Sequence, residues 1–352
     1  MKQGRTIIGA GVSPPSADDE PDTGAEAESR EVVVPAALHG ERLDRTLAQL
    51  VPEFSRNYLQ QLVEGGASAI NGRTASRAAH RVRAGDRIAI ELRPTPQSLA
   101  FRAEPMDLRV VHEDEHLLVV DKPAGLVVHP APGNWSGTLL NGLLARDARA
   151  AQLPRAGIVH RLDKDTSGLM VVARTRAAME ALVRMIAARE VSRQYLAIAH
   201  RPWAGAATRE VDAPIGRDPR NRLRMAVVDL ARDAGKPAAT TLQLLDSAAD
   251  ACLVQASLHT GRTHQIRVHM ACVGHPLVGD TLYGGMPGHG IERQALHAFR
   301  LAFRHPITDG PLDFRSALPA DLEQGLAAWG LRYNPSTAMA PVVAPVPPNH
   351  AR

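Results

Sequence analysis

The sequence is poor in aromatic residues, cysteine and lysine, and it has no long apolar run. Phe, Trp and Tyr make up 3% of its 352 residues, so aliphatic side chains must fill the core. Two cysteines, Cys252 and Cys272, cannot form a disulfide framework, and neither lies in a CxxC pair. No segment approaches the roughly 20 apolar residues of a membrane span, and the N-terminus lacks the apolar part of a signal peptide. We therefore expect a cytoplasmic protein with reduced thiols and no membrane partner.

The charge is unevenly distributed along the chain. Residues 1–30 carry a net charge of −3, whereas the remaining residues carry +7. Only four of the 41 basic residues are lysines, and arginine offers a planar set of donors that suits phosphates and base edges. Codon bias in a GC-rich genome is a simpler explanation for so much arginine. The composition is thus compatible with a polyanionic partner without requiring one.

Composition and turn residues divide the chain into five segments. We predict a disordered acidic tail at 1–30, a small basic module at 32–93, a linker at 94–105, a larger domain at 106–333 and a proline-rich, disordered tail at 334–352. A chain of this length is sufficient for two domains.

The small module combines two predicted helices with a turn and strands. Leucines at near-helical spacing predict a helix around 43–50, and a second helix around 56–63 ends at a glycine pair. Asn71-Gly72 forms a turn before the alternating strand RIAIEL. Arginines crowd around this turn, and together they favour contact with an RNA backbone, although each alone is typical of a solvated surface. The candidate RNA-binding arginines are Arg56, Arg73, Arg77, Arg81 and Arg83.

In the larger domain, strand-like segments outnumber helical ones. The predicted strands are LRVV, HLLVVD, GLMVVAR, QYLAIAH, TTLQLL and ACLVQASL, and the predicted helices cover 138–144, 176–189, 263–273 and 320–329. Most strands follow one another without an intervening helix. This order favours an α+β fold with a mixed, mostly antiparallel sheet.

Three short segments gather the reactive side chains. HRLDKDTSG, at 160–168, places two carboxylates in a loop before a buried strand. Asp165 and the two hydroxyl residues after it suit a turn that bonds its own backbone, whereas Asp163 fits that explanation less well. LHTGRTHQIRVHM, at 258–270, predicts a helix capped by Thr263, with Arg267 away from its buried stripe. RQYLAIA contains a lone aromatic residue, Tyr195, which could equally be a core residue.

These three segments resemble the RluA family of pseudouridine synthases. Further motifs in the family's order are DKPAGLVVHP, HPLVGDTLYG and QALHAFRL, so the resemblance covers about residues 40–330. The segment 32–93 resembles an S4-type RNA-binding domain through ERLDRTLAQL, SRNYLQQLV and VRAGDRI. This module and the PRAGIVHRLDKDTSGLMVVA segment are most similar to the RluD branch. The resemblance implies a pseudouridine synthase catalytic domain at 106–333.

The resemblance also implies a reaction and its residues. A member of this branch isomerises chosen uridines of large-subunit (23S) ribosomal RNA, free or in an assembling subunit, without cofactor or metal. Asp163 would be the essential carboxylate, and Arg267 would pair with it, position it and keep it ionised. Tyr195 would stack against the displaced base and help move the C5 proton. Arg161 would fill the gap left by the flipped-out uridine. We expect the enzyme to act as a monomer.

Three other functions are compatible with parts of the sequence. A metal-dependent hydrolase would use His259, His264 and His269, but a spacing of five residues rotates helical side chains by roughly 140° away from one another. A glycosidase would pair Asp163 with Asp165, yet the scarcity of aromatics argues against a sugar groove. A non-catalytic RNA-binding ribosome-assembly factor would retain the fold. Against it, the chain has all three of the residues that the chemistry requires.

Overall fold

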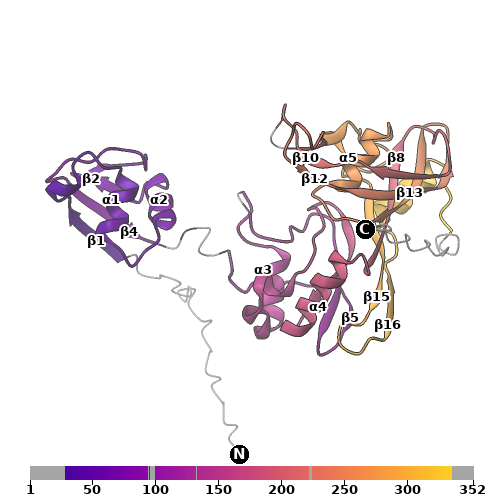
Figure 1. Ribbon diagram of the computed structural model, residues 1–352, viewed down its shortest axis with the longest axis horizontal. Coiled ribbons are helices and arrows are strands. Elements are labelled where there is room, and N and C mark those ends of the chain that lie inside the picture. The colour runs from indigo at the N-terminus through magenta and orange to yellow at the C-terminus, as the bar shows by residue number, and fades with distance from the viewer. Residues whose placement is uncertain (1–27, 94, 96–99, 132, 222–223, 335–352) are drawn as a thin grey trace, which may run out of the picture. The chain divides into compact units, whose positions relative to one another are not determined.

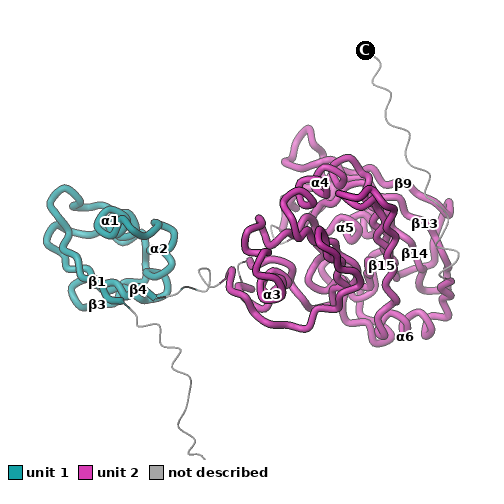
Figure 2. The backbone as a smooth tube through the Cα atoms, turned by 90° about the horizontal axis from the view of Figure 1, so that it is seen from below, with its two compact units in different colours: residues 1–98 teal, residues 99–352 magenta. Residues whose placement is uncertain are grey.

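The computed structural model describes residues 28–334, except 94, 96–99, 132 and 222–223 (Figure 1). The predicted proline-rich tail and residues 1–27 of the predicted acidic tail therefore lie almost wholly outside the described residues. The chain divides into two compact units, 1–98 and 99–352, which Figure 2 shows in different colours. In the described part of the chain we find no helix with both the length and the apolar composition needed to cross a membrane.

The first unit is a small four-stranded sheet with two helices. Its strands are β1 (Glu28–Val33), β2 (Ser68–Ile70), β3 (Arg73–Thr74) and β4 (Arg87–Leu92), in the spatial order β1-β4-β2-β3, and its helices are α1 (Leu43–Leu50) and α2 (Arg56–Glu64). Both helices bury leucines against Ile88 and Ile90 of β4. The Asn71-Gly72 turn is confirmed, since both residues have the positive φ, 50° and 77°, that a tight hairpin turn requires.

Two predicted boundaries of this unit are wrong. Residues 28–30 belong to β1, not to a disordered tail, because they pair with residues 90–92 of β4. The predicted linker at 94–105 ends earlier, since Asn141 donates hydrogen bonds to the carbonyls of Ala100 and Arg102. Ala100 is buried, so this half of the segment is part of the second unit.

The second unit is built on a nine-stranded mixed sheet. The principal strand order is β5-β6-β7-β15-β8-β14-β13-β9, with β16 paired to β15. The strands are β5 (Val110–Glu113), β6 (Leu117–Lys122), β7 (Ser167–Ala173), β8 (Ser192–His200), β9 (Thr208–Asp212), β13 (Ala239–Ser247), β14 (Ala251–Leu258), β15 (Leu296–Arg304) and β16 (Pro311–Arg315). Only β7 and β15 pair in parallel. The predicted α+β fold with a mostly antiparallel sheet is confirmed.

Helices cover both faces of the sheet and explain the apolar runs of its strands. They are α3 (Leu139–Arg146), α4 (Arg176–Ala187), α5 (Gln265–Cys272) and α6 (Ala320–Ala328). In β6, Leu117 and Val119 pack with α4, whereas Leu118 and Val120 pack with α3 on the other face. Strands buried on both faces have no polar alternation.

A small second sheet lies outside the predicted elements. It consists of β10 (Ile215–Arg217), β11 (Met225–Val227) and β12 (Gly235–Lys236), in the order β11-β10-β12. Strands of two or three residues are too short to show a hydrophobic period, which is why the sequence does not reveal them.

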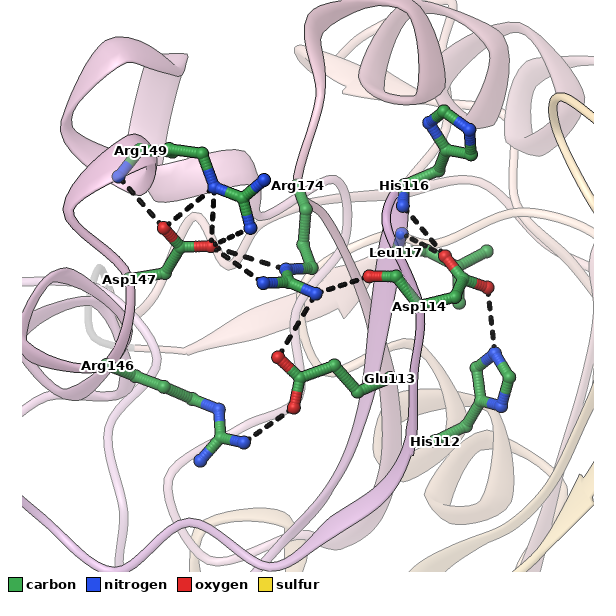
Figure 3. Close-up of polar contacts among 9 residues, drawn as sticks. All are labelled: His112, Glu113, Asp114, His116, Leu117, Arg146, Asp147, Arg149 and Arg174. Carbon is green, nitrogen blue, oxygen red and sulfur yellow. Dashed lines mark hydrogen bonds and ion pairs between the residues drawn. The ribbon is translucent and has the colours of Figure 1, made fainter.

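A cluster of charged residues ties α3 to the β5–β6 hairpin (Figure 3). Arg174, at the end of β7, lies 3.0 Å from the carboxylate of Asp147 and 3.1 Å from that of Glu113. Asp114 accepts hydrogen bonds from the backbone N–H groups of His116 and Leu117 and contacts the His112 ring. These pairs close the turn between the two strands.

Candidate active site

The loop before β7 presents Asp163. Beside this loop lies Lys122, which is 1% exposed and whose ammonium group donates to the carbonyls of Pro123, Leu126 and Lys164. Burial lowers the pKa of Lys122 to about 7, although Asp165 and Asp163 oppose this shift. The contact with the Lys164 carbonyl fixes the backbone directly after Asp163, and the other two contacts tie it to the loop at 123–126.

Arg267 of α5 is the partner of Asp163. Its Nη1 donates to Asp163 Oδ2 at 3.0 Å, while Nε and Nη2 donate to the two oxygens of Asp280 at 2.7 and 2.8 Å. Burial disfavours the guanidinium charge, but the hydrogen bonds and charges of Asp280 and Asp163 outweigh it and raise the pKa of Arg267. The arginine is therefore a fixed cation between two carboxylates.

Asp280 and Tyr283 hold Arg267 in place. Asp280 is 2% exposed, and the ring of Tyr283 lies 5.0 Å from the guanidinium carbon, a distance at which a cation interacts with an aromatic face. The Tyr283 hydroxyl is also 2.7 Å from Nδ1 of His264, whose Nε2 lies 4.0 Å from Asp163. Asp163 is thus flanked by two groups from one end of α5.

Tyr195 lies on β8 and is 5% exposed. Burial, with a contribution from Asp163, raises its pKa to about 12, although Arg193 opposes the shift. The phenol is therefore neutral at neutral pH. In this state it can donate a proton or stack against a base, but it does not accept a proton readily. The nearby His160 accepts a hydrogen bond from the Val171 N–H, and burial lowers its pKa to about 3, so this imidazole is neutral.

One pocket brings these groups together. Its volume is about 570 Å³, a size typical of small-molecule sites. Asp163, Tyr195, Arg267 and Arg161 all line it, as do residues 258–267. Arg161 is exposed at this pocket. The structure therefore places the four predicted site residues of the larger domain around one cavity.

The arginines of the first unit are exposed, but they do not form a uniform set. Arg56 is bound to the buried Asp44, with its Nε 2.9 Å from Oδ2, and Arg81 donates to the carbonyl of Gly40. Arg73, Arg77 and Arg83 form no side-chain ion pair within the described residues. The prediction of RNA contact is stronger for the second group than for the first, since a guanidinium already bound to a carboxylate is less available.

Three local details differ from the prediction. α5 begins without a cap from Thr263; its first turn follows His264, which has a positive φ of 57°, and the Gln265 side chain accepts from the Arg262 N–H instead. The side chains of Thr166 and Ser167 bond to Gln294 and His297 of a distant segment, although the Thr166 N–H donates to the Asp163 carbonyl within the loop. A local turn pattern does not reveal such long-range partners.

The structure also weighs against two of the alternatives. His259, His264 and His269 contact Thr241, Tyr283 and Thr240 respectively, and within the described ranges no group of three ligand-type residues could hold a metal ion. Asp165 lines a separate pocket of about 470 Å³, whereas Asp163 lines the larger one. The two carboxylates do not face a common cavity as a glycosidase requires.

Comparison with known proteins shows the family to which the chain belongs. The sequence model described as RNA pseudouridylate synthase matches residues 116–272, and that of the S4 domain matches residues 41–88. A protein of Neisseria meningitidis serogroup B named ribosomal large subunit pseudouridine synthase D is 46% identical over 322 residues, which cover 87% of this chain and 84% of its own. A protein of the same name from Xanthomonas campestris is 46% identical over 314 residues, covering 85% and 92%.

Solved structures agree with this assignment. Human RNA pseudouridylate synthase domain containing 1 superposes with a TM-score of 0.51 at 28% identity, covering 67% of this chain and 95% of its own. The chain belongs to the RNA pseudouridylate synthase family and is an RNA pseudouridine synthase with an N-terminal S4 domain. The predicted family and enzyme class are confirmed.

Proposed function

We propose that this enzyme isomerises specific uridines of large-subunit (23S) ribosomal RNA, with Asp163 as the catalytic carboxylate. The names of the most similar relatives support the choice of RNA. The observation that carries the choice of residue is the pairing of Asp163 with Arg267, which Asp280 holds on its other side, at the wall of a pocket large enough for one nucleoside.

The reaction breaks the N1–C1′ bond, turns the uracil and joins C5 to C1′; C5 then loses its proton and N1 gains one, so the product is an isomer of uridine. An ionised carboxylate can serve this exchange by attacking C1′, by adding to the ring or by assisting removal of a sugar proton. Arg267 keeps Asp163 charged and directs it, and Tyr195 offers an aromatic face to the displaced uracil. Neither residue requires a redox partner for this role.

The uridine can enter the pocket only after it leaves its stack, because the bond that breaks is otherwise enclosed by neighbouring bases. The Arg161 side chain, exposed at the pocket, would occupy the gap in the RNA. Arg73, Arg77 and Arg83 of the S4 domain would supply sequence-independent contacts to phosphates.

Nucleotide-resolution mapping of pseudouridine in ribosomal RNA tests the proposal. Cells that lack the protein would be compared with cells rescued by the wild type or by Asp163→Asn. We expect specific large-subunit sites to disappear and to return only with the wild type. If Asp163→Asn restores the sites, the assignment of the carboxylate is wrong; an unchanged map would point to another RNA or to a non-catalytic assembly factor.

A further inference from the structure

A second buried arginine lines the same pocket as Asp163. Arg193 lies at the start of β8, two residues before Tyr195, and is 7% exposed. Residues two apart on a strand point to the same face and are separated by roughly 7 Å. Arg193 and Tyr195 therefore present a cation and an aromatic ring side by side to whatever enters the pocket.

Unlike Arg267, Arg193 has no counter-ion in the described part of the chain. No carboxylate lies within ion-pair distance of its guanidinium, and its buried Nε has no hydrogen-bond partner. Burial accordingly lowers the pKa of Arg193, with only Tyr195 opposing. A buried charge without a partner destabilises the folded state. A protein that keeps such a group in a pocket retains it at a cost to its own stability.

The wall of the pocket is shaped around this guanidinium. A Cβ atom on Gly261 would lie 2.9 Å from Arg193 Nη1, closer than such atoms approach one another. Glycine at this position thus leaves room for the arginine beside the loop that leads into α5. The head group is accommodated by backbone, and its free donors are left for a ligand.

The charges that line the pocket favour an anionic ligand. Asp163 is its one carboxylate among the described lining residues, and it is already paired with Arg267. The arginines that line the pocket are Arg155, Arg161, Arg189, Arg193, Arg262 and Arg267. A neutral uracil would leave this excess of positive charge uncompensated, whereas a phosphate would neutralise part of it.

We propose that Arg193 is a substrate-binding residue that holds a phosphate adjoining the target uridine while its uracil lies against Tyr195. This inference rests on the proposed function and deepens it. The ribose separates base from phosphate within one nucleotide, a span similar to the spacing between Tyr195 and Arg193. The planar guanidinium can offer two parallel donors to phosphate oxygens, a match that a lysine cannot reproduce.

Mononucleotide binding tests the proposal without knowledge of the RNA site. Full-length wild type and Arg193→Met would be titrated with uridine, uridine 5′-monophosphate and uridine 3′-monophosphate by ligand-observed NMR. We expect the wild type to bind one monophosphate about 10-fold more tightly than uridine, as charge-assisted hydrogen bonds allow. Arg193→Met should lose this preference and keep its affinity for uridine. Arg184→Met, which removes an equal charge outside the pocket, should keep the preference.

Stability and turnover separate a binding role from a structural one. Arg193→Met should unfold at the same temperature as the wild type or higher, because it removes an uncompensated charge, and its kcat/KM on unmodified ribosomal RNA should fall about 10-fold or more. Arg193→Lys should recover part of that loss. A monophosphate preference that survives in Arg193→Met, or is absent from the wild type, overturns the proposal. If the wild type shows the preference but modifies no ribosomal RNA, the proposed function fails and this assignment stands.

Discussion

The arginines proposed to contact RNA lie in the first unit, the arginine that pairs with Asp163 lies in the second, and they differ in exposure and in pairing. In the S4 domain, Arg73, Arg77 and Arg83 are exposed and unpaired within the described residues, so they are free to follow an RNA backbone. In the catalytic unit, Arg267 is 6% exposed and bound to two carboxylates at fixed distances. Exposed arginine supplies affinity that depends on salt, and buried arginine supplies geometry that salt hardly affects. The comparison predicts that changes in the two units affect different measured quantities.

The largest effect is expected for Asp163→Asn. Turnover should fall below detection while RNA affinity stays within a few-fold of the wild type, because the change removes the reactive charge and keeps the shape of the side chain. Single-turnover formation of pseudouridine and RNA binding would be measured side by side. Asp165→Asn, two residues away and facing another pocket, is the matched control and should retain turnover. Equal loss of binding and turnover would contradict the assigned role.

A smaller effect on catalysis is expected for Asp280→Asn. Arg267 would keep Asp163 but lose its other anionic partner, so kcat should fall about 100-fold, as it does when reacting groups are displaced by an ångström. Breaking a buried pair should also lower the free energy of unfolding by about 3 kcal/mol. Activity and denaturant unfolding would be compared with Asp313→Asn, which breaks a more exposed pair with Arg300. An unchanged kcat would show that Asp163 does not depend on this support.

The double change Arg73→Gln/Arg83→Gln tests the exposed arginines of the S4 domain. RNA affinity should fall roughly 10-fold, and the slope of log affinity against log salt should become shallower by about 2. The kcat at saturating RNA should be the same as that of the wild type. Arg176→Gln/Arg304→Gln removes two exposed arginines that are paired with Glu180 and Asp309 in the catalytic unit, and it should leave the slope intact. If both double variants behave alike, the S4 domain is not the RNA arm.

The smallest effect is expected at the charged cluster of Figure 3, where charge serves the fold alone. Burial raises the pKa of Asp114, but hydrogen bonds from His112, Leu117 and His116 outweigh it and lower the pKa to about 2. A folded-state pKa below the unfolded one stabilises the protein above about pH 4, and the contribution is lost as the pH falls towards 2. Asp114→Asn should therefore melt earlier than the wild type at pH 7, with a smaller difference at pH 3 and unchanged kcat at pH 7. A constant difference at both pH values would contradict this account.

The sequence predicts most strands of the large sheet and the three principal site residues, but it misses β15 in the middle of that sheet and the residues that support the site. HRLDKDTSG, RQYLA and TGRTHQIRVHM carry enough local identity to point to Asp163, Tyr195 and Arg267 through resemblance. Asp280 follows a glycine and reads as a turn residue, and its role depends on Arg267, 13 positions away. The sequence does not reveal the charged strand β1, because an edge strand with both faces exposed needs no apolar alternation. Partners that meet only after folding leave no local pattern.

The place of β15 in the sheet means that the two halves of the sheet are joined late in synthesis. β15 lies between β7, which follows the Asp163 loop, and β8, which carries Tyr195, yet it is made after both. Domains generally fold as units during synthesis, the N-terminal domain first. A nascent chain that ends after β14 and α5 contains Asp163, Tyr195 and Arg267 but lacks the strand that joins the two halves of the sheet. The two halves of the sheet are therefore joined only after almost the whole domain has been translated.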